Sequence, residues 1–165
     1  MYYESVLRTF HREKVRYLIA GGMAVNLYGV PRFTKDLDIL IDPSEGNLRR
    51  LEKALKFLGY RPKVPVSMKA FLKPENWKKW KKEKGMLALN LYHPAKPYEE
   101  IDLLVNLPIE FSKAKKNSKI ISAGNLRLHL VGLEDLIRLK RQAKREQDLA
   151  DIEALRKVRK VKANK

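Results

Sequence analysis

The sequence predicts an α/β (α+β) fold, in which a mixed sheet is flanked by helices and the C-terminal helices pack on it. Short β-branched and apolar runs alternate with amphipathic helical patterns along the chain. Two strand-like runs, 86–93 and 99–106, are joined through the short segment "PAKPY", and the first of them alternates between apolar and polar residues. The pattern from residue 133 onward is helical. We therefore expect one compact domain, with a core over 1–131 and a C-terminal helical segment with a basic tail over 132–165.

The N-terminal part of the core is predicted to alternate helices and strands. Residues 2–14 have helical apolar spacing, and "RYLIAGG" (16–22) is a strand that runs into a glycine turn. The segment "MAVNLYG" (23–29) is a short helix that ends at a glycine, and "KDLDILID" (35–42) is a second strand. The clearest amphipathic helix spans 44–58, where leucines recur at spacings of three and four.

The segment 61–85 is rich in lysine and proline, and its role is left open by the sequence. Pro74 followed by a glutamate suits a helix start, and Trp77 and Trp80 then share one face. Helical spacing favours core positions for both tryptophans, with base stacking on nucleic acid as the alternative. The intervening lysines could follow a phosphate backbone without any stacking; they are Lys78, Lys79, Lys81 and Lys82.

The C-terminal part begins with a predicted hairpin about "AGN", which joins the strands 118–122 and 126–131. Two helices follow, over 133–145 and 146–160. The second of these is expected to present one apolar side, made of Leu149, Ile152 and Leu155.

The charge of the chain points to a polyanionic partner. Lys and Arg number 36 against 19 Asp and Glu, which leaves a net charge of +17 at pH 7. Nucleic acid is the leading candidate, because each phosphate that a basic side chain neutralises releases counterions. Hydrated lysines on a soluble basic protein, such as one from a heat-tolerant source, are the alternative.

Several classes of protein are disfavoured by composition. Cysteine is absent, which excludes disulfides and Cys-ligated zinc. The three histidines, His11, His93 and His129, are too widely spaced for a metal site and are expected to be structural or on the surface. No apolar run approaches the ~20 residues of a membrane span, and the N-terminus lacks the apolar core of a signal peptide. We expect no membrane association and a cytoplasmic location.

Two aspartates lie one residue apart in the predicted strand 35–42. Residues i and i+2 of a strand point to the same face, so Asp36 and Asp38 aim together while Leu37 and Ile39 point into the core. Neighbouring carboxylates repel each other, so either this face is solvated or a cation lies between them. Mg²⁺ suits such a pair, because it completes its octahedron with water and substrate phosphates. Asp102, in the apolar run "EEIDLLV", supplies a possible third carboxylate, unless it is a surface residue of an edge strand.

The glycine pair that precedes the short helix predicts an anion site. Gly21 and Gly22 allow close backbone approach, and the start of a helix near Met23 offers free N–H groups to a triphosphate. A Gly-Gly pair alone is more often a simple turn. If a triphosphate binds here, the nearby side chains expected to contact its phosphates or sugar are Arg32, Thr34 and Lys35.

These motifs carry a family resemblance. The segments "GG" (21–22), "DLD" (36–38) and "IDL" (101–103) resemble the signature of the nucleotidyltransferase superfamily that includes DNA polymerase β. The run "YLIAGGMAVNLYGVPRFTKDLDILID" resembles more closely the AbiEii-like abortive-infection toxins and minimal nucleotidyltransferases, which share its Arg-x-Thr-x-Asp-x-Asp pattern. The segment "LEDLIRLKRQAKREQDLADIEAL" is similar to the closing helices of that branch.

The resemblance implies a mixed nucleotidyltransferase sheet and a two-metal reaction. Asp36, Asp38 and Asp102 would be catalytic and would bind two Mg²⁺ ions, for which Mn²⁺ can substitute. Asp102 would bind the ion that activates the acceptor and could act as general base. An acceptor would then attack the α-phosphorus of an NTP, receive NMP and release pyrophosphate.

Four residues of the closing helices match the family pattern. Lys140 and Arg145 would contact the base or triphosphate, with a simple helix-surface position as the alternative. Asp148 and Asp151 are expected to be structural, because at spacing i, i+3 they can pair with nearby basic residues or cap the last helix.

Three functions are compatible with these features. The favoured one is an Mg²⁺-dependent nucleotidyltransferase that binds NTP and modifies RNA, tRNA in particular, in a toxin–antitoxin setting with an antitoxin or regulatory protein as partner. The second is an inactive nucleotidyltransferase fold that binds nucleic acid or an antitoxin-type partner. The third is an enzyme that nucleotidylates a small molecule or a protein.

Overall fold

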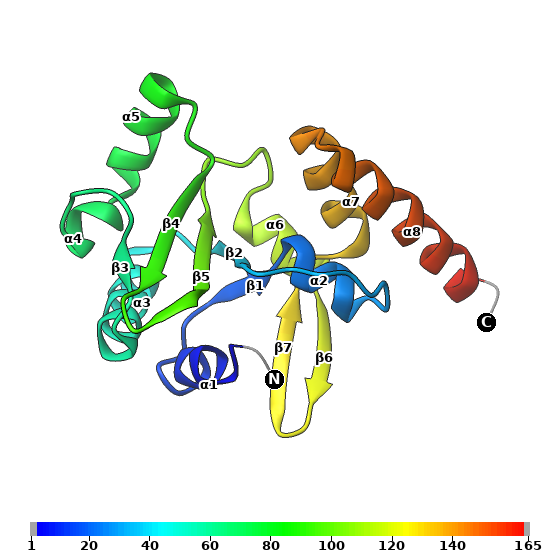
Figure 1. The fold of residues 1–165 in the computed structure, drawn as a ribbon, viewed down its shortest axis with the longest axis horizontal. Helices are drawn as coiled ribbons and strands as arrows, with labels where there is room; N and C mark the ends of the chain where they lie inside the picture. The colour runs from blue at the N-terminus through cyan, green and yellow to red at the C-terminus, as the bar shows by residue number, and fades with distance from the viewer. Residues whose placement is uncertain (1–2, 164–165) are drawn as a thin grey trace.

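A seven-stranded mixed sheet forms the centre of the computed structural model, which describes residues 3–163 (Figure 1). The strands are β1 (Tyr17–Ile19), β2 (Leu37–Ile41), β3 (Arg61–Pro62), β4 (Ala88–His93), β5 (Lys96–Leu104), β6 (Lys119–Ala123) and β7 (Leu126–Leu130). The helices are α1 (Glu4–Arg12), α2 (Gly21–Leu27), α3 (Glu45–Leu58), α4 (Met68–Phe71), α5 (Pro74–Lys84), α6 (Phe111–Lys116), α7 (Leu133–Ala143) and α8 (Glu146–Ala163). The predicted α/β class with a mixed sheet is confirmed.

The order of the strands is β3-β4-β5-β2-β1-β7-β6. Strand β2 lies at the centre, antiparallel to β1 and parallel to β5. The β4–β5 and β6–β7 pairs are antiparallel hairpins, and the sequence predicts the second of them. The parallel pairing of β2 with β5 joins segments about 60 residues apart, which is why no local sequence signal can reveal it.

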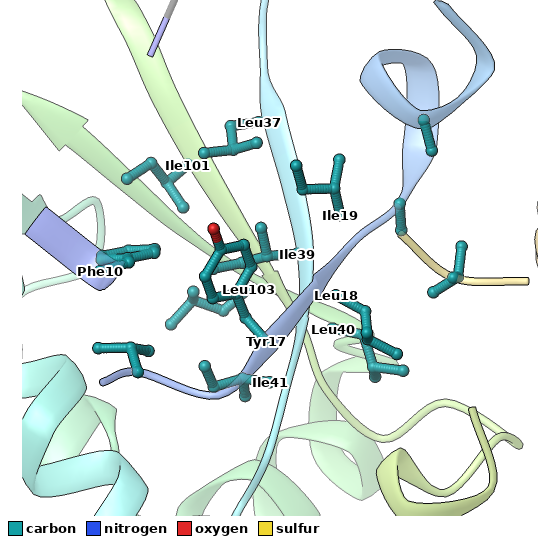
Figure 2. Packing of buried hydrophobic residues seen from close by; sticks show 14 of the residues in the cluster. Phe10, Tyr17, Leu18, Ile19, Leu37, Ile39, Leu40, Ile41, Ile101 and Leu103 are labelled. Carbon is teal, nitrogen blue, oxygen red and sulfur yellow. The ribbon is translucent and has the colours of Figure 1, made fainter. Parts of the chain in front are cut away.

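The core is built from alternate residues of the central strands. Leu37 and Ile39 are fully buried and point, with Ile101 and Leu103 of β5, toward Phe10 of α1 (Figure 2). The remaining positions of β2 and β5 face the other side of the sheet. The predicted inward direction of Leu37 and Ile39 is thus confirmed.

Some boundaries differ from the prediction. Helix α2 begins at Gly21 rather than near Met23, and Gly21 enters it with a left-handed φ of 56°. Strand β2 begins at Leu37, so Asp36 lies just before it. Helix α3 ends, as expected, at Gly59, whose φ of 83° is the left-handed conformation of a C-cap.

The segment 61–85 folds as a small unit at one edge of the sheet. Helix α5 starts at Pro74 as predicted, whereas the short elements β3 and α4 carry no periodic signal long enough to be recognised. Trp77 is buried and its Nε1–H donates to the Phe71 carbonyl at 2.7 Å. Trp80 packs against the core while remaining partly exposed. The prediction that the tryptophans face the core, rather than stack on bases, is thereby supported.

The two C-terminal helices pack on each other and on the sheet side that carries α2. The expected apolar side of α8 is partly wrong: Ile152 and Leu155 are buried, but Leu149 is 61% exposed. The buried positions of the first turns are taken by Asp148 and Asp151 instead. Within residues 3–163, no helix is both long and apolar enough to cross a membrane.

Candidate active site

Three carboxylates gather where β2 and β5 run side by side. The parallel register pairs Asp38 directly with Asp102, and it pairs Leu40 with Leu104. Paired residues of adjacent strands point to the same face, so both carboxylates lie on the side opposite the Leu37–Ile39 core face. Asp36 precedes Leu37 by one residue and lies close enough to raise the pKa of both other aspartates by charge repulsion. The fold thus brings together the acidic residues singled out in the sequence.

This cluster concentrates negative charge in a partly desolvated corner. Burial, followed by the charges of Asp102 and Asp36, raises the pKa of Asp38 to about 6. The pKa of Asp102 is also raised, mainly by burial. The Oδ1 atom of Asp36 is buried without a hydrogen-bond partner among the described residues. A buried acceptor with no donor, beside two other carboxylates, is the environment that a cation would stabilise.

Asn90 is a site residue that the sequence analysis missed. It lies on β4 directly opposite Asp102, and its Nδ2–H donates to Asp102 Oδ1 at 2.7 Å. This bond fixes the rotation of the Asp102 side chain and leaves its second oxygen available. A polar residue in the alternating run "ALNLYH" is the only trace of this role in the sequence, and it needs the cross-strand register to be interpreted.

The glycine pair packs against the aspartate strand and its preceding loop. A Cβ atom on Gly21, which has a φ of 56°, would lie 1.8 Å from Asp38 Oδ2. A Cβ atom on Gly22 would lie 2.5 Å from Thr34 Oγ1. The Gly22 N–H donates to the Asp38 carboxylate, which lowers its pKa and partly offsets the burial. The glycines are therefore needed for close packing, and part of the predicted anion site is occupied by Asp38 itself.

The predicted phosphate contacts Lys140 and Arg145 belong to an ion-pair network. The buried Lys140 ammonium contacts Asp148 Oδ1 at 3.2 Å and Asp151 Oδ2 at 2.6 Å. Arg145 donates from Nε to Asp148 Oδ2 at 2.8 Å, while the rest of its side chain is exposed. Arg32 pairs with Asp151 and so ties the loop before β2 to α8. The expectation that Asp148 and Asp151 are structural fits these contacts.

Lys35 is also held by an ion pair within the protein. Its Nζ donates to Glu100 Oε1 at 2.6 Å, and Lys63 contacts the other oxygen of Glu100. The Tyr3 hydroxyl donates to the Lys35 carbonyl at 2.6 Å and accepts the Glu100 N–H at 2.9 Å. These bonds fasten the start of β2 to β5. Lys35, like Arg32, thus has a structural partner in the protein, and its contact with nucleotide stays a prediction.

A cavity of about 170 Å³ opens beside the carboxylates. Its polar lining comes from Gly21, Asp38, Lys140, Gln142, Arg145 and Asp148. Its apolar lining comes from leucines on two sides, Leu87, Leu104 and Leu107 on one and Leu136 and Leu139 on the other. An apolar pocket with a few convergent charged groups is typical of a ligand site, and this volume, below the roughly 300 Å³ of common ligand pockets, suits part of a nucleotide rather than a whole one.

The comparisons with known proteins agree with this geometry. Residues 6–75 match the family described as "Nucleotidyl transferase AbiEii toxin, Type IV TA system". The solved structure of the lincosamide antibiotic adenylyltransferase LnuA, lincomycin-bound, is similar with a TM-score of 0.61 and 18% identity, over 93% of each chain. The chain has the nucleotidyltransferase fold. The structure of ANT(2")-Ia in complex with adenylyl-2"-tobramycin gives a TM-score of 0.58 and 14% identity, over 97% of this chain and 92% of that one.

The family resemblance expected from the sequence is confirmed by these matches. The matched residues 6–75 include the glycine pair and the run from Arg32 to Asp38, whereas Asp102 and the closing helices lie beyond them. Comparison with curated protein sequences gives no match. The nucleotidyltransferase fold therefore rests on the AbiEii match and on the architecture of the whole chain.

Proposed function

We propose that this protein is a metal-dependent nucleotidyltransferase that transfers NMP from an NTP to RNA. The observation that carries the proposal is the parallel register that sets Asp38 beside Asp102, with Asp36 adjacent and a cavity at the same place. A protein that only binds polyanions gains nothing from clustered carboxylates on its binding side, because they repel phosphate. This argues against an inactive binding module.

The residues present fit a pair of divalent cations. Among residues 3–163 no three acidic or histidine side chains form a ready-made metal cluster. Mg²⁺ is commonly held by one or two carboxylates and completes its shell with substrate phosphates and water, so such a cluster is not required. Asp36, with its unpartnered oxygen, Asp38 and Asp102 would hold the ions. When bound, Mg²⁺ (or Mn²⁺ in its place) would neutralise these carboxylates and the charge that develops on the attacking and leaving oxygens.

The side chains of the protein would supply positioning and proton transfer. The free oxygen of Asp102, whose carboxylate Asn90 orients, would accept the proton of the acceptor hydroxyl. The acceptor oxygen then forms a bond to the α-phosphorus as the bond to the pyrophosphate oxygen breaks, and pyrophosphate leaves. The enzyme forms no covalent intermediate in this scheme, so its contribution is orientation and charge.

Part of the nucleotide would occupy the cavity beside Asp38. Lys140 and Arg145 line it and bring positive charge close to the carboxylates. Gly21 lines it as well and, lacking a side chain, lets a phosphate approach the backbone. Lys140 acts mainly through its buried pairs, whereas the largely exposed Arg145 can turn toward a triphosphate. Contacts of Gly22, Arg32, Thr34 and Lys35 with the nucleotide form part of the same proposal.

RNA, with tRNA in particular, is the acceptor that the charge favours. The net charge of +17 suits a polyanion and opposes binding of a cationic antibiotic. A small-molecule acceptor is the second candidate, because the two similar structures are named as an antibiotic adenylyltransferase and as a complex with an adenylylated antibiotic. The AbiEii match supports a toxin–antitoxin setting, with a cytoplasmic location and an antitoxin or regulatory partner.

The test is transfer of label from α-³²P-labelled NTPs to total RNA in the presence of Mg²⁺. We expect labelled RNA with the wild type, and loss of label with Asp36→Asn and with Asp102→Asn. Glu153→Gln, which removes an exposed carboxylate on α8, is the matched control and should retain transfer. Label on lincomycin or tobramycin but not on RNA would establish the second candidate. RNA binding with no transfer from any NTP would establish a binding module and refute the proposal.

A further inference from the structure

Two groups of basic side chains flank the cavity without acidic partners. On α5, apart from the exposed Lys81, which bonds Asn106, the exposed lysines are Lys78, Lys79, Lys82 and Lys84; at the end of α7 the exposed basic residues are Arg138, Arg141 and Lys144. None of these seven forms an ion pair with any acidic side chain of residues 3–163. Lysines elsewhere commonly have such a partner, as in the pairs Lys53–Glu13, Lys56–Glu52 and Lys157–Glu153.

The two groups stand on opposite sides of the cavity. Leu87, which follows α5, lines one side, and Leu139 and Ala143 of α7 line the other. Figure 1 shows α5 and the α7–α8 pair on either side of the ends of β4 and β5. The two basic groups are therefore carried by the elements on either side of the cavity, whose lining includes Asp38.

Helix α5 is fixed relative to the strand that carries Asp102. Asn106, two residues after β5, donates from Nδ2 to the Trp77 carbonyl at 2.7 Å and to the Met86 carbonyl at 3.3 Å. Lys81 in turn donates a hydrogen bond from Nζ to the Asn106 carbonyl at 2.8 Å. The lysines of α5 are thus held on a rigid support at a set position from the carboxylates.

We propose that the exposed basic residues of α5 and of the α7 end form one surface that binds the phosphodiester backbone of single-stranded RNA across the cavity. Unpartnered like charges on two facing elements repel each other, and a polyanion that spans both relieves this repulsion. In the proposed reaction the cavity is taken by the NTP, so the RNA strand contacts the basic residues of the two helices and presents only a hydroxyl toward Asp102. The role of this surface in acceptor binding rests on the proposed function, but the binding itself requires neither NTP nor metal.

The test measures anisotropy of a fluorescein-labelled oligouridylate over a range of NaCl concentrations, with EDTA present. Two double variants reverse charge on one helix each, Lys78→Glu with Lys82→Glu and Arg138→Glu with Arg141→Glu. The control, Arg156→Glu with Lys160→Glu, changes the net charge equally on exposed and unpaired positions toward the far end of α8. Circular dichroism of each variant verifies folding.

Each helix variant should bind about 25-fold more weakly at about 0.1 M salt, because each phosphate contact on a single strand contributes ~0.7 to the salt slope. Its slope should decrease in magnitude by about 1.4, and the control should retain the wild-type slope. Equal weakening in all three variants would show a net-charge effect alone and overturn the proposal. Absence of RNA binding, or binding of polyglutamate in preference to RNA, would overturn it too. Oligothymidylate that binds as well as oligouridylate would support backbone recognition.

The two proposals fail in distinguishable ways. If RNA binds and the helix variants weaken its binding, but no NMP is transferred from any NTP, the proposed function fails and the RNA-binding surface stands. If label is transferred to RNA at the same KM in wild type and both helix variants, the enzyme stands and the surface is refuted.

Discussion

Replacing Lys140 with methionine removes one charge from the most deeply buried ion-pair network among the described residues. Methionine has a similar length and no charge, so packing is nearly kept while the partners are lost. The side chains of Lys140, Asp148 and Asp151 are only 5%, 1% and 3% exposed. Breaking a buried pair by removal of one partner costs about 3–5 kcal/mol. Asp148 keeps Arg145 and Asp151 keeps Arg32, so we expect the lower end, about 3 kcal/mol.

The pH dependence of stability gives this prediction a second readout. Burial would raise the pKa of Asp148, but the hydrogen bonds from Arg145 and Lys140 together outweigh it and lower that pKa below its usual 3.8. The pKa of Asp151 is lowered in the same way: burial raises it, and the hydrogen bond and charge of Lys140 are the main effects that lower it. Because the folded pKa is depressed, the network stabilises the wild type fully above about pH 4, and this contribution is lost as the pH falls below 3.8.

In the variant, the ammonium of Lys140 no longer lowers the pKa of Asp148 and Asp151, whereas Arg145, Arg32 and Gln147 still do. The contribution of Lys140 to the stability of the wild type is present above the usual pKa of 3.8 and is lost as the pH falls below it. The difference in stability between variant and wild type should therefore be larger at pH 7 than at about pH 3.

Urea unfolding followed by circular dichroism measures both effects. With a slope of about 2 kcal/mol per M, the midpoint should fall by about 1.5 M at pH 7. Lys157→Met is the control, because it removes a charge from the exposed Lys157–Glu153 pair and should cost no more than about 0.5 kcal/mol. A loss below about 1 kcal/mol for Lys140→Met, or one that does not change with pH, would show that the network is solvated and refute the reasoning.

Three further predictions concern single contacts. Gly21→Ala should abolish NMP transfer and lower the free energy of unfolding in denaturant by about 1–2 kcal/mol. The reason is that φ is 56° and that the new Cβ displaces the Asp38 carboxylate. Activity close to that of the wild type would contradict this prediction. Asn90→Ala should lower kcat roughly tenfold by freeing Asp102, with unfolding nearly unchanged at this exposed position; a loss of stability with unchanged kcat would show a structural role. Trp77→Phe should lower stability by about 1–3 kcal/mol in thermal unfolding, because a buried carbonyl loses its donor, and an unchanged midpoint would show that water replaces it.

Local periodicity was sufficient for those features that depend on neighbours in the chain. The alternation in "DLDILI" predicts that Leu37 and Ile39 face the core and that Asp38 points the other way, and the structure agrees. Pro74 marks the start of α5 because proline suits the first helical position. Gly59 marks the end of α3 because it accepts a positive φ.

Local periodicity could not predict contacts between segments that are far apart in the chain. The apolar pattern of α8 predicts that Leu149 is buried, yet α7 and the loop before β2 supply Lys140 and Arg32, which draw Asp148 and Asp151 inward instead. Arg32 and Asp151 are 119 residues apart, and such a pairing leaves no local trace. The predicted start of α2 near Met23 is wrong by two residues, because both glycines belong to the helix.

By itself the sequence determined the class of fold, the positive charge and the acidic residue types, because period, composition and chain-neighbour geometry are local properties. The tertiary structure alone decided that Asp102 stands beside Asp38, that Asn90 orients it and that Lys140 is locked between two aspartates. These relations depend on strand register and helix docking, which are set by the burial of the whole core rather than by any one segment.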